Sequence, residues 1–456
     1  MIRQNKLNIL GFFLLTLVIG ILSVISGSFF VENISIFLLI LSFVMNLLFL
    51  VYYVIQFKGK NKNLNPYSDV AIITIISTFL YFYSYPIDFS LKILNDISTN
   101  VYYKTLATTI VANISLLIGI FIGIHISPLN INTLKKEKHN NSGKVALFFV
   151  FLGICLMIYD LYRLGGLSVL GIKNRLHFFE IQRNTGDTMM SLPWHDIITA
   201  GLLVYAMSIR NRVEAVRLLI GLIVLSLFFF FCLGSRTYIL FVCFPILGVL
   251  IDKDFIKINK KTGILLGIAI LLLVSPFFTI YRDSLISDQP INFKNKQEWA
   301  FSSGETGTAF KITSDIINSE YYPDADPSYL TSILYALPSV IFEFITGSNK
   351  PLNIADWYTV KYYPYMYKSG GGFGFSPIAQ AWMNGGLKVV IGVFLIFGIF
   401  IACLNNTKKY KYLLLALVIW FQRGSFQSVF TEFIYILSIM LIIFFVSKIL
   451  NPSKRG

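Results

Sequence analysis

Apolar runs long enough to cross a lipid bilayer recur along nearly the whole sequence, and they limit the possible fold more than any other feature. A transmembrane helix needs roughly 20 consecutive, mainly apolar residues. Hydrophobic residues make up 55% of the 456-residue chain and charged residues only 13%, and the mean hydropathy is +0.70. A soluble domain would not tolerate this composition in water. Because backbone polar groups inside a membrane must pair within the protein, the runs are expected to be helices.

The pattern predicts an all-α polytopic membrane protein with about twelve transmembrane helices. The first run follows Arg3 and Lys6, as in a signal peptide, but no small-residue cleavage site ends it, so we interpret it as a helix. We place the spans at about residues 9–27, 34–56, 69–86, 105–127, 145–163, 193–209, 216–233, 236–251, 263–280, 386–404, 411–422 and 426–447.

Basic residues assign the two sides of the membrane, because cytoplasmic loops carry an excess of lysine and arginine. The basic clusters occur in alternate connections, at 58–62, 135–138, 210–217, 253–261 and 408–411. These connections and both termini are therefore predicted to be cytoplasmic. The chain then divides into nine helices in residues 1–280, a large extracytoplasmic loop with short helices in 281–385, and three helices in 386–456.

Several classes of function are excluded by what the sequence lacks. The net charge of +15 is spread over short clusters between apolar runs rather than gathered on one face, so no nucleic-acid partner is expected. No P-loop, Rossmann glycine motif or HExxH motif occurs, and we expect neither cofactor nor metal ion. The four cysteines lie in apolar runs without CxxC spacing, which excludes a disulfide framework.

Arginines predominate among the cations of the outer connections, whereas the inner clusters are mainly lysine. The planar guanidinium binds phosphate oxygens with two hydrogen bonds, so outer arginines suit a pyrophosphate. The alternative is an arginine that extends to lipid head groups. Arg236 is the strongest candidate, because it ends a short turn between two apolar runs. We expect catalytic roles for Arg236 and Arg282 and substrate binding by Arg175, Arg183 and Arg423.

A glycine-rich segment, residues 370–376, leads directly into a stretch compatible with a helix. Such a turn lets backbone N–H groups approach an anion closely. We therefore expect Gly371, Gly372, Ser376 and Asn384 to contribute to substrate binding. The alternative is a hinge that re-enters the membrane, in which Ser376 is only the helix N-cap and Pro377 occupies the favoured first position.

The large loop is rich in acidic and aromatic residues. Among its acids, Glu305 is our candidate for the base that takes a proton from a sugar hydroxyl. Other acids of the loop are expected to be solvated or to bind sugar. The tyrosines and tryptophans of the loop either stack on sugar rings or form an interfacial aromatic belt. Asp160 and Arg163, three residues apart, are expected to pair with each other.

Several features occur together in this sequence: many spans, a Gly-Ser-Arg turn at 234–236, a long outer loop, and a Gly-Phe-Ser-Pro element that leads into Ala379-Gln380-Ala381 and Asn384-Gly385-Gly386. This combination resembles the O-antigen polymerase (Wzy-type) family of oligosaccharide repeat-unit polymerases. The resemblance covers most of the chain, and the element at 370–386 is its best local match. Members of the family often carry glutamate where this sequence has Gln380, so no catalytic carboxylate is expected at this position.

The resemblance implies a lipid-linked glycosyltransferase (GT-C-like) fold in the bacterial inner membrane. It further implies that a glycan on undecaprenyl diphosphate is transferred to the next lipid-linked repeat unit on the outer leaflet. The implied partners are the undecaprenyl-diphosphate-linked oligosaccharide, the lipid bilayer, a chain-length regulator and a flippase. Since the diphosphate leaves as an anion, arginines stabilise it without a metal.

Two other functions stay open at this point. An O-antigen ligase would share the spans, the loop and the arginines, but ligases carry a histidine in the large outer loop. None of the four histidines, His125, His139, His177 and His195, lies between 281 and 385. A lipid-linked oligosaccharide flippase or other transporter would place charges along a path within the spans and would not need a long outer loop. The glycan itself, O-antigen, capsule or another lipopolysaccharide or surface polymer, is left open.

Overall fold

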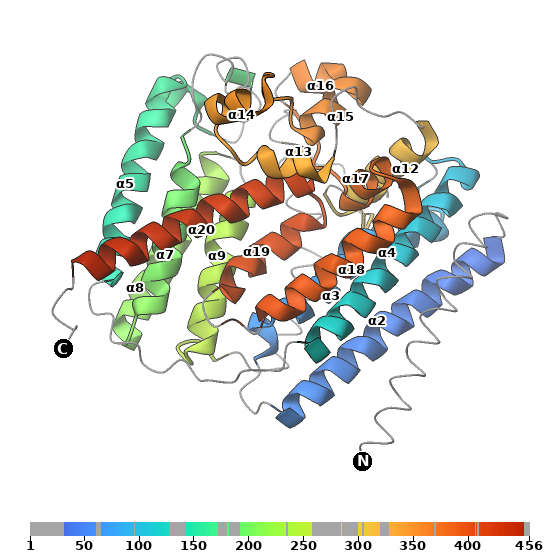
Figure 1. The fold of residues 1–456 in the computed structure, drawn as a ribbon, viewed down its shortest axis with the longest axis horizontal. Coiled ribbons are helices and arrows are strands. Elements are labelled where there is room, and N and C mark those ends of the chain that lie inside the picture. Colours follow the sequence, from blue (N-terminus) through green and yellow to red (C-terminus); the bar gives the residue numbers. More distant parts are fainter. Residues whose placement is uncertain are drawn as a thin grey trace.

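The structure is a computed structural model that describes most of the chain as a helical bundle (Figure 1). The described residues are 32–60, 65–94, 96–126, 142–171, 180–181, 192–233, 236–257, 284, 300–302, 305–319, 328–368, 371–405, 407 and 410–450. Within them, every element of regular structure is helical. The predicted all-α class is therefore confirmed for this part of the chain.

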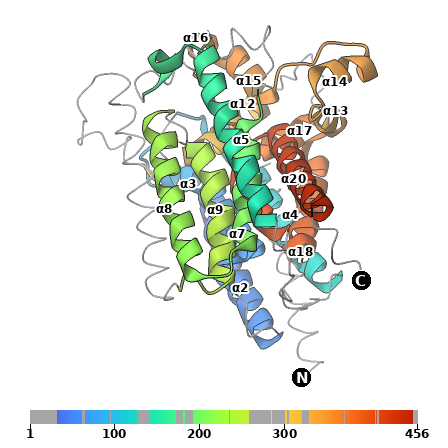
Figure 2. The ribbon, with the colours of Figure 1, turned by 90° about the vertical axis from the view of Figure 1, so that its left-hand side faces the viewer.

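The longer helices run side by side and form the body of the bundle (Figures 1 and 2). They are α2 (Glu32–Lys60), α3 (Val70–Ser90), α4 (Thr99–Ile126), α5 (Ser142–Arg163), α7 (Trp194–Ser208), α8 (Arg212–Phe231), α9 (Arg236–Asp252), α18 (Gly386–Asn405), α19 (Lys411–Phe421) and α20 (Phe426–Ile449). Two 3-10 turns, η1 (Pro66–Ser68) and η2 (Gly166–Val169), lie between them in sequence.

Shorter helices from the predicted outer loop gather at one end of this bundle, at the top of Figure 1. They are α12 (Glu305–Ser319), α13 (Tyr329–Leu334), α14 (Ser339–Thr346), α15 (Ile354–Tyr362), α16 (Pro364–Lys368) and α17 (Pro377–Met383). Their grouping at one end gives the loop region a small core of its own, built around the buried residues Ile316, Tyr358 and Phe375.

Six of the described helices are long and apolar enough to cross a membrane: α3, α4, α5, α8, α18 and α20. Shorter apolar helices cover Leu39–Ile55, Thr237–Asp252 and Lys411–Phe421. These lengths support a polytopic membrane protein, as predicted. The count of twelve spans remains a prediction, because the expected segments at 9–27 and 263–280 lie outside the described residues.

Helices α4 and α18 approach each other so closely that only glycine fits at their contact. A Cβ atom on Gly119 would lie 2.2 Å from the carbonyl oxygen of Leu395, and one on Gly398 would lie 2.4 Å from that of Leu116. Small residues at such crossings let two helix backbones meet directly, and van der Waals packing then holds transmembrane helices together. The α4–α18 pair is therefore a fixed reference for the segments joined to it.

Replacing Gly398 by valine is predicted to lower the free energy of unfolding by about 1–3 kcal/mol, the usual cost of overpacking. The side chain would collide with backbone atoms, which cannot move aside. The measurement is thermal unfolding of the purified protein in detergent. Gly392→Val is the matched control on the same helix, because nothing lies within 4 Å of its Cβ position. Equal unfolding temperatures for the two variants would contradict the close contact.

Candidate functional site

A cavity of about 220 Å³ lies between the ends of α3 and α4 and the loop helices α12 and α15. Residues from four segments line it: Tyr85, Leu94, Asp96, Ala300, Ser302, Gly307, Thr308, Lys311, Ile312, Tyr358, Tyr363 and Phe373. The aromatic rings pack in series, with ring centroids 4.8 Å apart for Tyr358 and Tyr362 and 4.6 Å apart for Tyr363 and Phe373. The cavity therefore combines flat apolar surfaces with charged groups.

Asp96 and Lys311 form an ion pair at the cavity, with Lys311 Nζ 2.8 Å from Asp96 Oδ2. The Tyr85 hydroxyl also donates to Asp96. Partial burial raises the pKa of Asp96, but the hydrogen bonds from Lys311 and Tyr85 outweigh this effect and leave the pKa lowered. Since both side chains are about two-fifths exposed, the pair contributes little stability. Its value is to hold two hydrogen-bonding groups in fixed positions.

Asp315 is a second carboxylate beside the cavity. Tyr358, whose ring lines the cavity, donates a hydrogen bond of 2.5 Å to Asp315 Oδ2. Burial raises the pKa of Asp315, and the hydrogen bond from Tyr358 only partly offsets this rise. The cavity is anchored to the bundle by Asp88 of α3, which accepts hydrogen bonds of 2.6 Å from both the N–H and the hydroxyl of Ser302.

Arg423, predicted to bind substrate, lies where three segments meet. Its Nη2 donates to the Thr237 hydroxyl at 3.1 Å, and Thr237 directly follows Arg236 at the start of α9. Its carbonyl oxygen accepts a hydrogen bond of 2.9 Å from the N–H of Phe375. The structure thus brings the backbone of Arg236, the side chain of Arg423 and the glycine-rich segment together, although the three are far apart in sequence.

Gly374 makes this junction possible. A Cβ atom at this position would lie 2.3 Å from the Arg423 carbonyl oxygen, so no other residue fits without moving the backbone. The preceding residue, Phe373, lines the cavity. Consecutive residues therefore connect the aromatic cavity to the arginine. Two long helices begin near Arg423: α9 lies beside it in space, and α20 begins shortly after it in sequence. Helix N-termini favour anions.

The other predicted residues of this segment have structural contacts. Ser376 is buried and caps α17, its Oγ accepting from the Ala379 N–H at 3.3 Å and lying 2.7 Å from the Thr313 hydroxyl. Asn384 ends the same helix and donates from Nδ2 to the Gln380 carbonyl at 2.8 Å. Ser376 is thus the N-cap of α17, with Pro377 in the first turn, and substrate binding by Ser376 stays a prediction.

Gly371 and Gly372 are described, and neither has a positive φ angle. A Cβ atom on Gly371 would lie 2.7 Å from Met366 Cγ, so the constraint at that position is packing against α16. The positive φ angles of this region fall at Gly385 (142°) and Gly386 (67°), where the chain turns from α17 into α18. The re-entry into the bundle therefore depends on this second pair of glycines.

Gln380 is fully buried and joins three helices. Its Oε1 accepts from the Phe426 N–H at the start of α20 at 2.8 Å, and its Nε2 donates to the Ser332 hydroxyl of α13 at 3.0 Å. A neutral amide supplies both the donor and the acceptor that this position needs. Its role here is to hold α17, α20 and α13 in register.

The structure describes the other predicted site residues only in part. Arg175, Arg183 and Arg282 lie outside the described residues. The backbones of Arg236 and Glu305 begin α9 and α12, while their side chains lie outside the described part. Separately, the expected pair of Asp160 and Arg163 is confirmed, with an oxygen-to-nitrogen distance of 2.6 Å.

Sequence reasoning missed several polar residues that the fold brings together. Asp96 and Lys311 meet across 215 positions of sequence, and His195 and Asp196 meet Glu432. For Glu432 a signal existed, because it is a lone carboxylate inside the apolar run at 426–447, and an ionisable residue within a span is a candidate for function. For Asp96 and Lys311, no local pattern marks the pairing.

Comparison with known proteins gives one match. A family model described as O-antigen polysaccharide polymerase Wzy matches residues 9–454, which is nearly the whole chain. No curated protein and no solved structure matches the sequence significantly.

The raised pKa of Asp315 predicts that stability falls with rising pH. The folded state holds a proton that the unfolded chain releases near pH 3.9, so the free energy of unfolding decreases as pH rises from there through the folded-state value. Asp315→Asn keeps an acceptor for Tyr358 without the charge. It should unfold at a higher temperature than the wild type at pH 7, with the difference vanishing near pH 4.

Thermal unfolding at both pH values checks this expectation. Glu343→Gln, which removes an exposed carboxylate of α14, is the control and should leave the unfolding temperature unchanged. A lower unfolding temperature for Asp315→Asn at pH 7 would mean that the ionised carboxylate stabilises the fold.

Proposed function

The chain belongs to the O-antigen polysaccharide polymerase Wzy family, and we propose that it transfers a growing glycan from undecaprenyl diphosphate to the next lipid-linked repeat unit. The reaction is proposed to take place on the outer leaflet of the bacterial plasma membrane, with both termini in the cytoplasm and residues 281–385 outside. The positive-inside distribution of basic residues supports this orientation.

One observation carries the proposal: consecutive residues, Phe373 to Phe375, connect an aromatic cavity to the backbone of Arg423. The substrate has the same two parts, a sugar next to a diphosphate. The apolar faces of sugar rings pack on tyrosine and phenylalanine rings, and Asp96 and Lys311 offer hydrogen bonds to hydroxyl groups. The Arg423 guanidinium, which contacts Thr237 at the start of α9, suits the diphosphate.

In the proposed step, a hydroxyl oxygen of the acceptor sugar forms a bond to the anomeric carbon of the donor. The bond from that carbon to the diphosphate oxygen breaks, and the lipid diphosphate leaves with the electron pair. The charge developing on this oxygen is stabilised by Arg423 together with Arg236 and Arg282, while Arg175 and Arg183 are proposed to hold the rest of the lipid-linked substrate.

The hydroxyl proton is transferred to a carboxylate, for which we retain Glu305. Glu305 begins α12, and Gly307, Thr308 and Lys311 of the same helix line the cavity. The position of Glu305 on the same helix as these lining residues supports its choice as the base. Gly371, Gly372, Ser376 and Asn384, in the glycine-rich segment and the helix that follows it, are proposed to contribute to substrate binding.

Deletion of the gene tests the function directly. A polymerase predicts that long surface glycan disappears while single repeat units remain on the carrier or the acceptor, visible as loss of the ladder on a gel. Accumulation of long lipid-linked glycan with none at the surface would indicate a ligase instead. Lipid-linked units retained on the cytoplasmic side would indicate a flippase.

Replacing Arg423 by lysine is predicted to slow polymerisation by about 10- to 100-fold, because charge is kept but the two-pronged guanidinium contact, worth about 1.5–3 kcal/mol, is lost. The measurement is the chain-length distribution of the glycan at equal protein abundance in the membrane. Arg212→Lys, at an exposed arginine that begins α8, is the matched control. Normal chain lengths from a stable Arg423→Lys protein would remove Arg423 from the site.

A further inference from the structure

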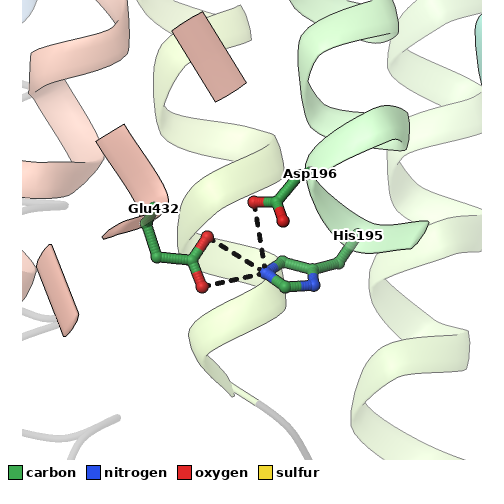
Figure 3. A group of neighbouring side chains, drawn as sticks. All are labelled: His195, Asp196 and Glu432. Atoms are coloured by element: carbon green, nitrogen blue, oxygen red, sulfur yellow. Dashed lines mark hydrogen bonds and ion pairs between the residues drawn. The ribbon is translucent and has the colours of Figure 1, made fainter. Parts of the chain in front are cut away.

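Three ionisable side chains from two distant parts of the chain meet between α7 and α20 (Figure 3). His195 and Asp196 lie in the first turn of α7, and Glu432 lies in the second turn of α20. The Nε2 atom of His195 lies 3.0 and 3.1 Å from the two oxygens of Glu432 and 3.4 Å from Oδ1 of Asp196. The imidazole thus points between two carboxylates.

We propose that His195, Asp196 and Glu432 bind a divalent transition-metal ion. Their ligand atoms all lie within 4.8 Å of one another. A tetrahedral ion with bonds of about 2.0–2.1 Å separates its ligand atoms by about 3.3–3.4 Å. The distances from Nε2 to the carboxylate oxygens are close to this value, so an ion fits with small side-chain shifts.

Charge balance allows the same conclusion. Among the residues that the structure describes, His195 is the only cation that pairs with either carboxylate. One proton on a carboxylate and one on the imidazole would keep this cluster neutral without a metal. Two ionised carboxylates, a neutral imidazole and a divalent cation also sum to zero charge, so the ion binds without leaving a net charge between helices. Ligand deprotonation and metal binding are coupled in this way at protein sites.

The Asp196 carboxylate is buried beside the imidazole. Asp196 is 1% exposed, and its Oδ1 makes no hydrogen bond of good geometry within the described residues, its contact being the 3.4 Å ion pair with His195 Nε2. Buried polar oxygens are normally satisfied, and an ion placed between Asp196 and Glu432 would satisfy this one. The side chains of His195 and Glu432 are 20% and 18% exposed, so an ion can reach the cluster from one side.

Aromatic neighbours hold the imidazole in place. The rings of Tyr238 and Trp194 lie 5.1 and 5.6 Å from the His195 ring, centroid to centroid. The Trp194 indole is itself fixed by a 3.1 Å hydrogen bond to Asp160. One imidazole with two carboxylates suits zinc or manganese, and three protein ligands with an open side resemble catalytic rather than structural metal sites. This conclusion departs from the sequence-based expectation of no metal.

The test is metal binding by the full-length protein, purified in detergent and stripped with a chelator. We expect uptake of about one Zn²⁺ or Co²⁺ per chain, measured by elemental analysis and by the visible spectrum of Co²⁺. His195→Gln and Glu432→Gln should each weaken binding by more than about 100-fold, because loss of outer-shell partners alone costs about 10- to 100-fold. Asp315→Asn, a carboxylate outside the cluster, is the control and should bind as the wild type does.

Negligible uptake by the wild type, or equal uptake by His195→Gln, would overturn the proposal; the first outcome would leave the cluster as an ion pair. If Glu432→Gln does not fold, the wild type and His195→Gln decide the question. Binding is read without measuring polymerisation, and Arg423→Lys should retain the metal. Failure of the metal site and failure of the proposed polymerase function are therefore distinguishable.

Discussion

The glycine contact between α4 and α18 is the constraint on which the rest of the described structure depends. The chain enters α4 shortly after Asp96, which lines the cavity, and it enters α18 directly from α17 and the glycine-rich segment. The two sides of the site are therefore continuations of two helices whose backbones touch. Lys104 of α4, 5.7 Å above the Trp382 ring, adds a contact near the same end. Any separation of the pair would move the cavity wall away from the segment that holds Arg423.

Much of the fold was predictable because each span is a local property of the chain. An apolar run of sufficient length forms a helix in lipid whatever its neighbours are, and α3, α4, α5, α18 and α20 begin and end close to the expected positions. Which helices touch was not predictable. The contact of Gly119 with Leu395 depends on the tertiary arrangement. A single glycine in an apolar run does not indicate which helix it will pack against.

The candidate site divides in the same way. Arg423 and the glycine-rich segment were predicted from residue type and spacing, and the structure joins the Arg423 carbonyl to Phe375 of that segment. The approach of glycine N–H groups to an anion stays a prediction. The structure adds a close approach of Gly374 to a backbone carbonyl and a turn at Gly385 and Gly386. The Glu432 cluster needed the fold, since its members are separated by 237 positions in sequence.

The hydrogen bonds of Gln380 have a consequence for how the family can vary. An amide donates to Ser332 and accepts from the Phe426 N–H at once, whereas an ionised carboxylate only accepts. A serine hydroxyl both donates and accepts, so a glutamate at position 380 would keep both contacts once the Ser332 hydroxyl turned to donate. The junction between the outer loop and the last helix therefore depends on a hydroxyl at position 332 more than on the amide itself.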